Sequence, residues 1–256
     1  NGPSSGVGNG LGGRASSAQL AGYETLLYTS GDLSVNLIAN GDFNNDPSND
    51  IQIVQNWFAQ GDKNAFFTGD EFVRGMRDAG ADGEAFINTY LPVSFVQNNV
   101  GPLIGNQTAP LVNTIDGNGI ITRVPEWIAY GGCLGINSFD AVTAAGTSQR
   151  LAEFTNSQGN PGVYNYAAAL YNNLSSENAD VVYMPYDFMF IYNAPGYTPP
   201  AGYEGISARA VILEDILGFF GTTGGSPVIG ADAPAAGLQV ANFPNPFNPQ
   251  TRSEEH

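Results

Sequence analysis

Two segments of this chain share one pattern, in which an apolar run leads into a glycine and an aspartate and then into a segment with helical spacing. The first run, ETLLYT at residues 24–29, leads to Asp32. The second run, NAFFT at residues 64–68, leads to Asp70 and then to EFVRGMRDAG. Neighbouring parallel strands need a crossover, and a helix is the usual crossover. The repeated pattern therefore predicts a doubly wound α/β layer.

The rest of the chain predicts further elements of this layer. Residues 50–60 place apolar side chains at helical spacing behind an aspartate N-cap, and residues 206–220 predict a final helix that Gly221 ends. The apolar face of that final helix consists of Ala210, Leu213, Ile216, Leu217 and Phe220. Further strands are predicted at 93–97, 120–124, 127–131 and 180–192. Pro185 should break the last of them, because proline has no N–H for a ladder. We expect an α/β fold, with a mostly parallel sheet and helices on both faces.

The composition along the chain predicts four parts. Residues 1–19 are rich in Gly and Ser, residues 20–221 form the α/β domain, residues 222–237 are a Gly/Pro/Ala linker, and residues 238–256 are an extended tail. The chain opens on Asn1 in place of methionine, which indicates a processed or partial chain.

The charge of the chain is sparse and one-sided. Asp and Glu number 24 against 8 Lys and Arg, which gives a formal net charge of −16. Because nucleic acids and anionic lipids are held mainly by Lys and Arg, we expect neither as a partner. The sequence has no apolar run of about 18 residues, so we expect no membrane insertion. The Gly, Asn, Ser and Thr that supply the remaining polarity are typical of secreted bacterial proteins.

The segment NFPNPFNPQT, residues 242–251, carries a resemblance to a known family. It is similar to the start of the C-terminal immunoglobulin-like sorting domain of secreted bacterial proteins, of the type IX secretion and flagellar-hook-capping-like kind. The resemblance implies export and an extracellular or cell-surface location, and it implies nothing about chemistry. The chain stops at His256, before the strands of such a domain. The region before the tail resembles the flavodoxin-like or amidotransferase-like domains that often precede such tails.

Cys133 lies in YGGCLGIN, which has the Gly-x-Cys-x-Gly form of a nucleophile elbow. This turn resembles that of class I glutamine amidotransferases, in which a histidine activates the cysteine. An ordinary thiol is only a few per cent thiolate at neutral pH, and the single histidine of this chain is the terminal His256. We therefore expect Cys133 to be a small buried residue at the end of a strand.

Asp32 and Asp70 form the second candidate site. If their strands are parallel neighbours, both carboxylates lie at the carboxyl edge of the sheet, where open α/β folds bind their ligands. There they could bind a metal or share acid–base work, and Asp140, Asp187 and Glu71 could join them. The alternative is that each aspartate caps the helix that follows it.

A calcium loop is the third candidate. Positions 1, 3, 5 and 9 of a loop template are occupied by Asp42, Asn44, Asp46 and Asp50. Pro47 stands where the template has glycine, and Ile53 stands where it has the closing glutamate. A Ca²⁺ site and a solvated Asn/Asp turn both remain open.

Aromatic residues and the tail suggest two further partners. A stripe that could stack on a glycan consists of Tyr183, Tyr186, Phe188, Phe190 and Tyr192, although such stripes are more often core. The tail can lie in a groove or add to a sheet edge of another copy of the chain, through Phe243, Pro244, Pro246 and Phe247.

These observations favour a non-enzymatic extracellular structural or adhesive module that self-assembles, in a filament, through its tail. One alternative is a hydrolase-like enzyme that uses Asp32, Asp70 and Cys133 at the carboxyl edge. Another is a calcium-dependent carbohydrate-binding module. Convergence of the three side chains around an open pocket would favour the enzyme.

Overall fold

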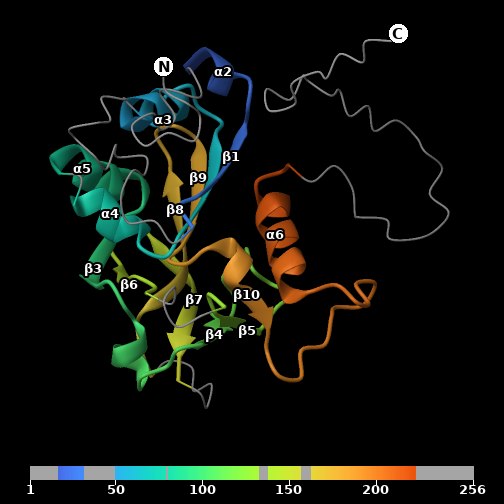
Figure 1. The fold of residues 1–256 in the computed structure, drawn as a ribbon. Helices are drawn as coiled ribbons and strands as arrows, with labels where there is room; N and C mark the ends of the chain where they lie inside the picture. Colours follow the sequence, from blue (N-terminus) through green and yellow to red (C-terminus); the bar gives the residue numbers. More distant parts are fainter. Residues whose placement is uncertain (1–16, 32–49, 79, 133–137, 157–162, 223–256) are drawn as a thin grey trace, which may run out of the picture. The chain divides into compact units, whose positions relative to one another are not determined.

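A mixed sheet of eight strands organises this protein in the computed structural model, which describes residues 17–31, 50–78, 80–132, 138–156 and 163–222. The strands are β1 (Thr25–Thr29), β2 (Asn64–Thr68), β4 (Leu111–Thr114), β5 (Glu126–Ala129), β7 (Gln149–Thr155), β8 (Ala167–Leu174), β9 (Ala179–Met184) and β10 (Ile191–Asn193). Their order across the sheet is β1-β2-β9-β8-β7-β4-β5-β10 (Figure 1). A second, two-stranded antiparallel sheet pairs β3 (Val93–Gln97) with β6 (Ala141–Ala144).

The helices lie around this sheet as α2 (Ser17–Ala21), α3 (Asp50–Phe58), α4 (Phe72–Asp78), α5 (Ala81–Tyr90) and α6 (Ala208–Phe219), with short 3₁₀ turns η1 (Gly101–Ile104) and η3 (Phe188–Phe190). Within the described ranges, no helix is both long and apolar enough to cross a membrane.

The expected mostly parallel α/β fold is wrong. In the large sheet, β2 pairs in parallel with β1 and with β9, while β8, β7, β4, β5 and β10 continue the sheet in antiparallel pairs. The sequence patterns do not predict β4, β6, β7 or β8. The β7 and β8 segments, QRLAEFT and AAALYNNL, are rich in residues that favour helices, and most of their side chains are buried whichever face they point to. Their burial removes the polar–apolar alternation by which a strand is recognised.

The local predictions around the first two strands are confirmed. Strand β2 has the predicted bounds, and β1 lies parallel to it with Thr29 opposite Thr68. Strand β9 ends at Met184, immediately before Pro185, as the missing proline N–H predicts. The strand predicted at 120–124 is wrong, because these residues form bends without regular secondary structure.

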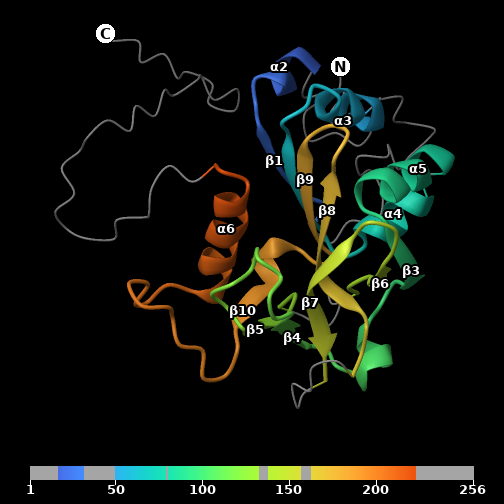
Figure 2. The ribbon, with the colours of Figure 1, turned by 180° about the vertical axis from the view of Figure 1, so that it is seen from behind.

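The two faces of the sheet pack against different helices. Helices α3, α4 and α5 lie on one face of β1, β2 and β9, and α6 lies on the other (Figures 1 and 2). The buried face of α6 consists of Ala208, Val211, Ile212 and Ile216. This face differs from the predicted one, since Ala210 is exposed and Leu213 and Leu217 are only partly buried. The helix is therefore turned so that Leu213 lies at the margin of the core.

Candidate functional site

The loops after β1 and β2 meet at the carboxyl edge of the sheet, as their Gly-Asp patterns predict. The Ser30 amide donates a hydrogen bond to the Thr68 carbonyl at 2.9 Å, and the Asp70 amide donates to the Gly31 carbonyl at 2.9 Å. Each loop therefore continues the pairing of the strands beyond their ends. The parallel neighbour relationship that the sequence predicts is correct here.

Gly69 allows these two loops to approach each other closely. Its φ is 151°, and a Cβ at this position would lie 1.7 Å from Ser30 Oγ and 2.9 Å from Ser30 Cβ. Real Cβ atoms do not approach other atoms so closely, so any other residue at position 69 would push the β1 loop away. The glycine before Asp70 is thus a packing requirement of the carboxyl edge.

Asp70 is fully buried and connects two distant segments to the β2 loop. Its Oδ1 accepts a hydrogen bond from the Asp187 amide at 3.0 Å, and its carbonyl accepts one from the Asp140 amide at 2.9 Å. The predicted partner, Asp32, lies outside the described residues. Asp70, Asp140 and Asp187 do come together at this edge, as the sequence suggested they could.

Asp187 holds the turn after β9 against β1. Its Oδ2 accepts a hydrogen bond from the Thr29 hydroxyl at 2.9 Å, and its Oδ1 accepts one from the Met189 amide at 2.7 Å. The second bond caps the short η3 turn. Both carboxylate oxygens are therefore used within the protein, and the side chain is almost completely buried.

Asp140 caps α4 from a remote position in the chain. Its Oδ2 accepts a hydrogen bond from the Arg74 amide, the third of that helix, at 3.0 Å. Oδ1 is buried and meets no hydrogen-bond donor among the described residues. Burial raises the pKa of the Asp140 carboxyl from 3.8 to about 8; the Glu71 carboxylate adds to the rise, and the Arg74 amide opposes it. The buried side chain is therefore largely protonated at neutral pH.

Tyr183 and Glu71 complete the surroundings of this carboxyl. Burial raises the pKa of the Tyr183 hydroxyl well above its ordinary value, and the carboxylates of Asp140 and Asp70 raise it further. Glu71 binds Arg74 at 2.6 Å across one helical turn. Asp70, Asp140 and Tyr183 have almost no solvent contact.

A groove opens to solvent beside this buried cluster. Its volume is about 190 Å³, and it is lined by Leu27, Tyr28, Thr29, Phe66, Thr68, Asp187, Phe188, Met189 and Leu213. The lining is almost entirely apolar, with the Thr29–Asp187 pair as a small polar end. Leu27 and Met189 keep 52% and 56% of their surface exposed, which marks the groove mouth as an apolar surface facing water.

The groove exists because α6 covers the middle of the sheet and not its β1 edge. Leu27 and Thr29 point to the α6 face, since they lie opposite Phe66 and Thr68, and Phe66 belongs to the α6-side core. The helix packs on this core, and only Leu213 reaches the groove from α6. An edge strand is thus left with its apolar face partly uncovered.

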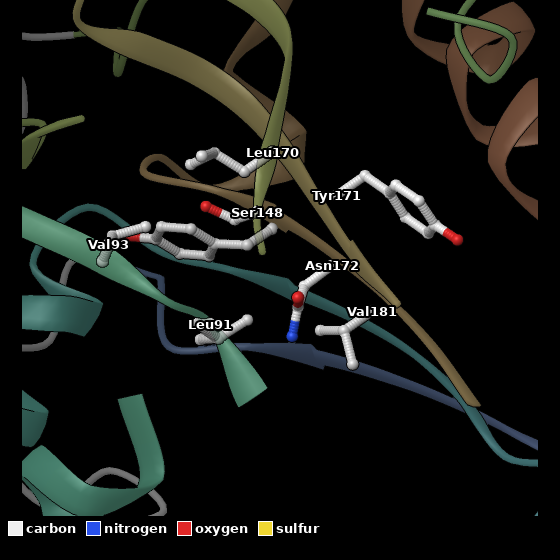
Figure 3. Close-up of a pocket in the computed structure, with 8 residues that line it drawn as sticks. Leu91, Val93, Ser148, Leu170, Tyr171, Asn172 and Val181 are labelled. Carbon is white, nitrogen blue, oxygen red and sulfur yellow. The ribbon is translucent and has the colours of Figure 1, made fainter. Parts of the chain in front are cut away.

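A second cavity, shown in Figure 3, is too small to be a binding site. It has a volume of about 10 Å³, enough for about one water molecule, and lies among Leu91, Val93, Ser148, Leu170, Asn172 and other residues. Two of the polar side chains that line it are already bonded: Asn172 Nδ2 donates to the Tyr90 carbonyl at 3.2 Å, and Ser148 Oγ donates to the Pro92 carbonyl at 2.5 Å. Tyr183 also lines it, and its buried hydroxyl has no hydrogen-bond partner among the described residues. This cavity is a packing void.

Most residues of the other predicted sites lie outside the described ranges. These residues are Cys133, His256, Asp42, Asn44, Asp46, Phe243, Pro244, Pro246 and Phe247. Asp50 is buried in the first turn of α3. Within the described ranges, no group of three His, Cys, Asp or Glu side chains could hold a metal ion.

The predicted aromatic stripe is mainly core. Tyr183 and Tyr186 are buried, and the Tyr186 hydroxyl accepts a hydrogen bond from the buried Trp127 indole at 2.9 Å. Phe188 and Phe190 pack against the α6-side core, whereas Tyr192 is 48% exposed. The stripe is therefore not a continuous platform for a sugar.

Sequence reasoning named three of the residues that line the groove, Asp187, Phe188 and Leu213, but for other roles, and it missed the rest. One signal could have suggested them: in ETLLYT and NAFFT, alternate residues share a face, so Leu27, Thr29, Phe66 and Thr68 form one set once the strands are aligned. The contributions of Met189, in the η3 turn, and of Leu213, in α6, come from distant parts of the chain and have no local signal.

No protein-family model matches the chain, and no curated protein matches it.

Proposed function

We propose that this protein is a non-enzymatic, extracellular structural or adhesive module that assembles with copies of itself through its tail. One observation carries the proposal: the carboxyl groups at the carboxyl edge are buried and accept hydrogen bonds from backbone amides, whereas the groove beside them is open and apolar. A site of this kind favours binding over acid–base chemistry, because a catalytic group must reach the proton it transfers.

The size of the groove supports a side chain as its ligand. Small-molecule sites usually enclose about 300–1,000 Å³. The groove has about 190 Å³, opens to solvent, and has one polar end. Such a space suits one aromatic or aliphatic side chain of a protein partner better than a whole metabolite.

The extracellular part of the proposal rests on the tail and on charge. NFPNPFNPQT resembles the start of a sorting domain of exported bacterial proteins, and the net charge of −16 disfavours nucleic acids and anionic membranes.

Sedimentation velocity of the full chain over a hundredfold concentration range, with electron microscopy of the same samples, tests this function. We expect species that grow with concentration and appear as open-ended chains. A monomer at every concentration would contradict self-assembly. A hydrolytic turnover that Asp187→Asn removes without a change in the unfolding midpoint would support the hydrolase alternative instead. Assembly or glycan binding that requires added Ca²⁺ would support the carbohydrate-binding alternative.

A further inference from the structure

The β1 edge of the sheet combines two features that peptide-binding domains use. Within the described part of the chain, β1 pairs only with β2, so one side of its backbone faces no described strand. Its sequence, TLLYT, has none of the charges or prolines that usually protect an edge. The apolar groove opens beside it, at Leu27 and Thr29. An extended peptide can then bond to the edge while its side chains enter the groove.

The tail has a proline pattern that fits such an edge. Pro244 and Pro246 alternate with Phe243, Asn245 and Phe247. In an extended strand, successive N–H groups point to opposite sides, so residues two apart point to the same side. The two prolines, which have no N–H, can therefore both face solvent while the other three residues face the edge. Prolines within sheets occur in this arrangement.

The same alternation places the two phenylalanine side chains on one face. Phe243 and Phe247 lie four residues apart, about 13 Å along a strand, with Asn245 between them. The groove has room for one aromatic ring, between Leu27, Phe66 and Leu213. One phenylalanine can therefore enter the groove while the other contacts its exposed rim.

The length of chain before this segment allows it to reach another molecule. Helix α6 ends at Phe219, and about 20 residues separate its end from Phe243. A chain of this length spans about 25 Å on average if it is a random coil and several times more if it is fully extended. A contact between the tail of one copy and the sheet edge of the next is head-to-tail, and head-to-tail contacts that do not close form filaments.

We propose that residues 243–247 of one copy add to the β1 edge of a neighbouring copy, with a phenylalanine side chain in the groove. This inference rests on the proposed function, because it names the surface through which assembly occurs.

Two variants that each remove one half of the contact test this inference. Leu27→Glu places a charge at the groove mouth, where the side chain is half exposed, and the tail double variant Phe243→Ala/Phe247→Ala removes both aromatic rings. Each should stop self-assembly, with about a tenfold or larger loss of affinity. An equimolar mixture of Leu27→Glu and the tail double variant should form one-to-one dimers and nothing larger. In such a mixture, only the Leu27→Glu chains keep an intact tail, and only the tail-variant chains keep an intact groove. Val163→Glu, at another exposed apolar residue, is the matched control and should assemble normally.

The proline alternation has its own test. Asn245→Pro removes an N–H that faces the edge and should abolish assembly, whereas Pro246→Ala adds an N–H that faces solvent and should leave assembly intact. Equal effects of the two variants would overturn strand addition.

Failure of the inference can be told apart from failure of the proposed function. If the wild-type chain does not assemble, the proposed function fails. If it assembles and Leu27→Glu assembles equally well, the function stands and the groove is not the receptor. If Leu27→Glu and the tail double variant do not form dimers when they are mixed, the tail and the groove do not bind each other and the inference fails.

Discussion

Asp140 Oδ2 accepts a hydrogen bond from the Arg74 amide at 3.0 Å, so a carboxyl group 66 positions away caps the first turn of α4. The aspartate that precedes this helix, Asp70, uses its Oδ1 for the Asp187 amide instead. The two acidic groups thus hold different distant loops at one end of the same helix. These bonds connect the carboxyl edge, beside which the groove lies, to both loops.

The buried Asp140 carboxyl should make the stability of the protein depend on pH. Its pKa rises from 3.8 to about 8 on folding, so the folded state binds more protons between these values. The free energy of unfolding should then fall as pH rises from about 4 to 8, by up to about 1.4 kcal/mol per pH unit from this group. Asp140→Asn removes this term and should be more stable than the wild type at pH 8.

Urea unfolding of wild type and Asp140→Asn between pH 4 and 8 measures this difference. The exposed Asp82→Asn on α5 controls for the loss of one negative charge. If the difference in free energy of unfolding between Asp140→Asn and wild type does not change with pH, Asp140 is ionised throughout this pH range.

Gly69→Ala should be strongly destabilising, because the added Cβ would lie 1.7 Å from Ser30 Oγ. We expect a loss of about 3 kcal/mol in the free energy of unfolding. Ser30→Gly removes both side-chain atoms that the Cβ would meet, so the double variant should be more stable than the sum of the single effects predicts. Additive effects in this double-mutant cycle, measured by urea unfolding, would place the cost of Gly69→Ala elsewhere.

Asp187→Ala should cost more stability than Thr29→Val. The alanine removes the acceptor of the Thr29 hydroxyl and of the Met189 amide, so we expect a loss of about 2–3 kcal/mol. The valine removes the donor of only one of these bonds and should cost about 1 kcal/mol. Chemical denaturation gives both values, and a larger effect of Thr29→Val would show that Asp187 is not the centre of this loop contact.

Lys63, the single lysine of the chain, should resist acylation in the folded protein. Its ammonium group donates to the Tyr23 carbonyl at 2.9 Å and to the Ala21 carbonyl at 3.2 Å, and the residue is 7% exposed. Treatment with an N-hydroxysuccinimide ester, followed by mass spectrometry of peptides, should label the terminal amine first and Lys63 only after denaturation. Equal labelling of the two amines in the native protein would contradict the burial of Lys63.

Local sequence patterns were sufficient for the elements that interact with their neighbours in the chain. Apolar spacing and the chemistry of Gly, Asp and Pro predict strands β1 and β2 and the two helices expected to start at Asp50 and Glu71. They also predict the break at Pro185. The same patterns placed Asp70 at the carboxyl edge of two parallel strands, where it lies.

Only the tertiary structure decided the rest of the sheet and the character of the site. The β7 and β8 segments favour helices by composition, and burial among neighbouring strands overrides that preference. The capping of α4 by Asp140 and the meeting of Leu27 with Met189 and Leu213 join residues far apart in the chain. Local propensity contains no information about such contacts, because their free energy depends on which surfaces the folded chain brings together and removes from water.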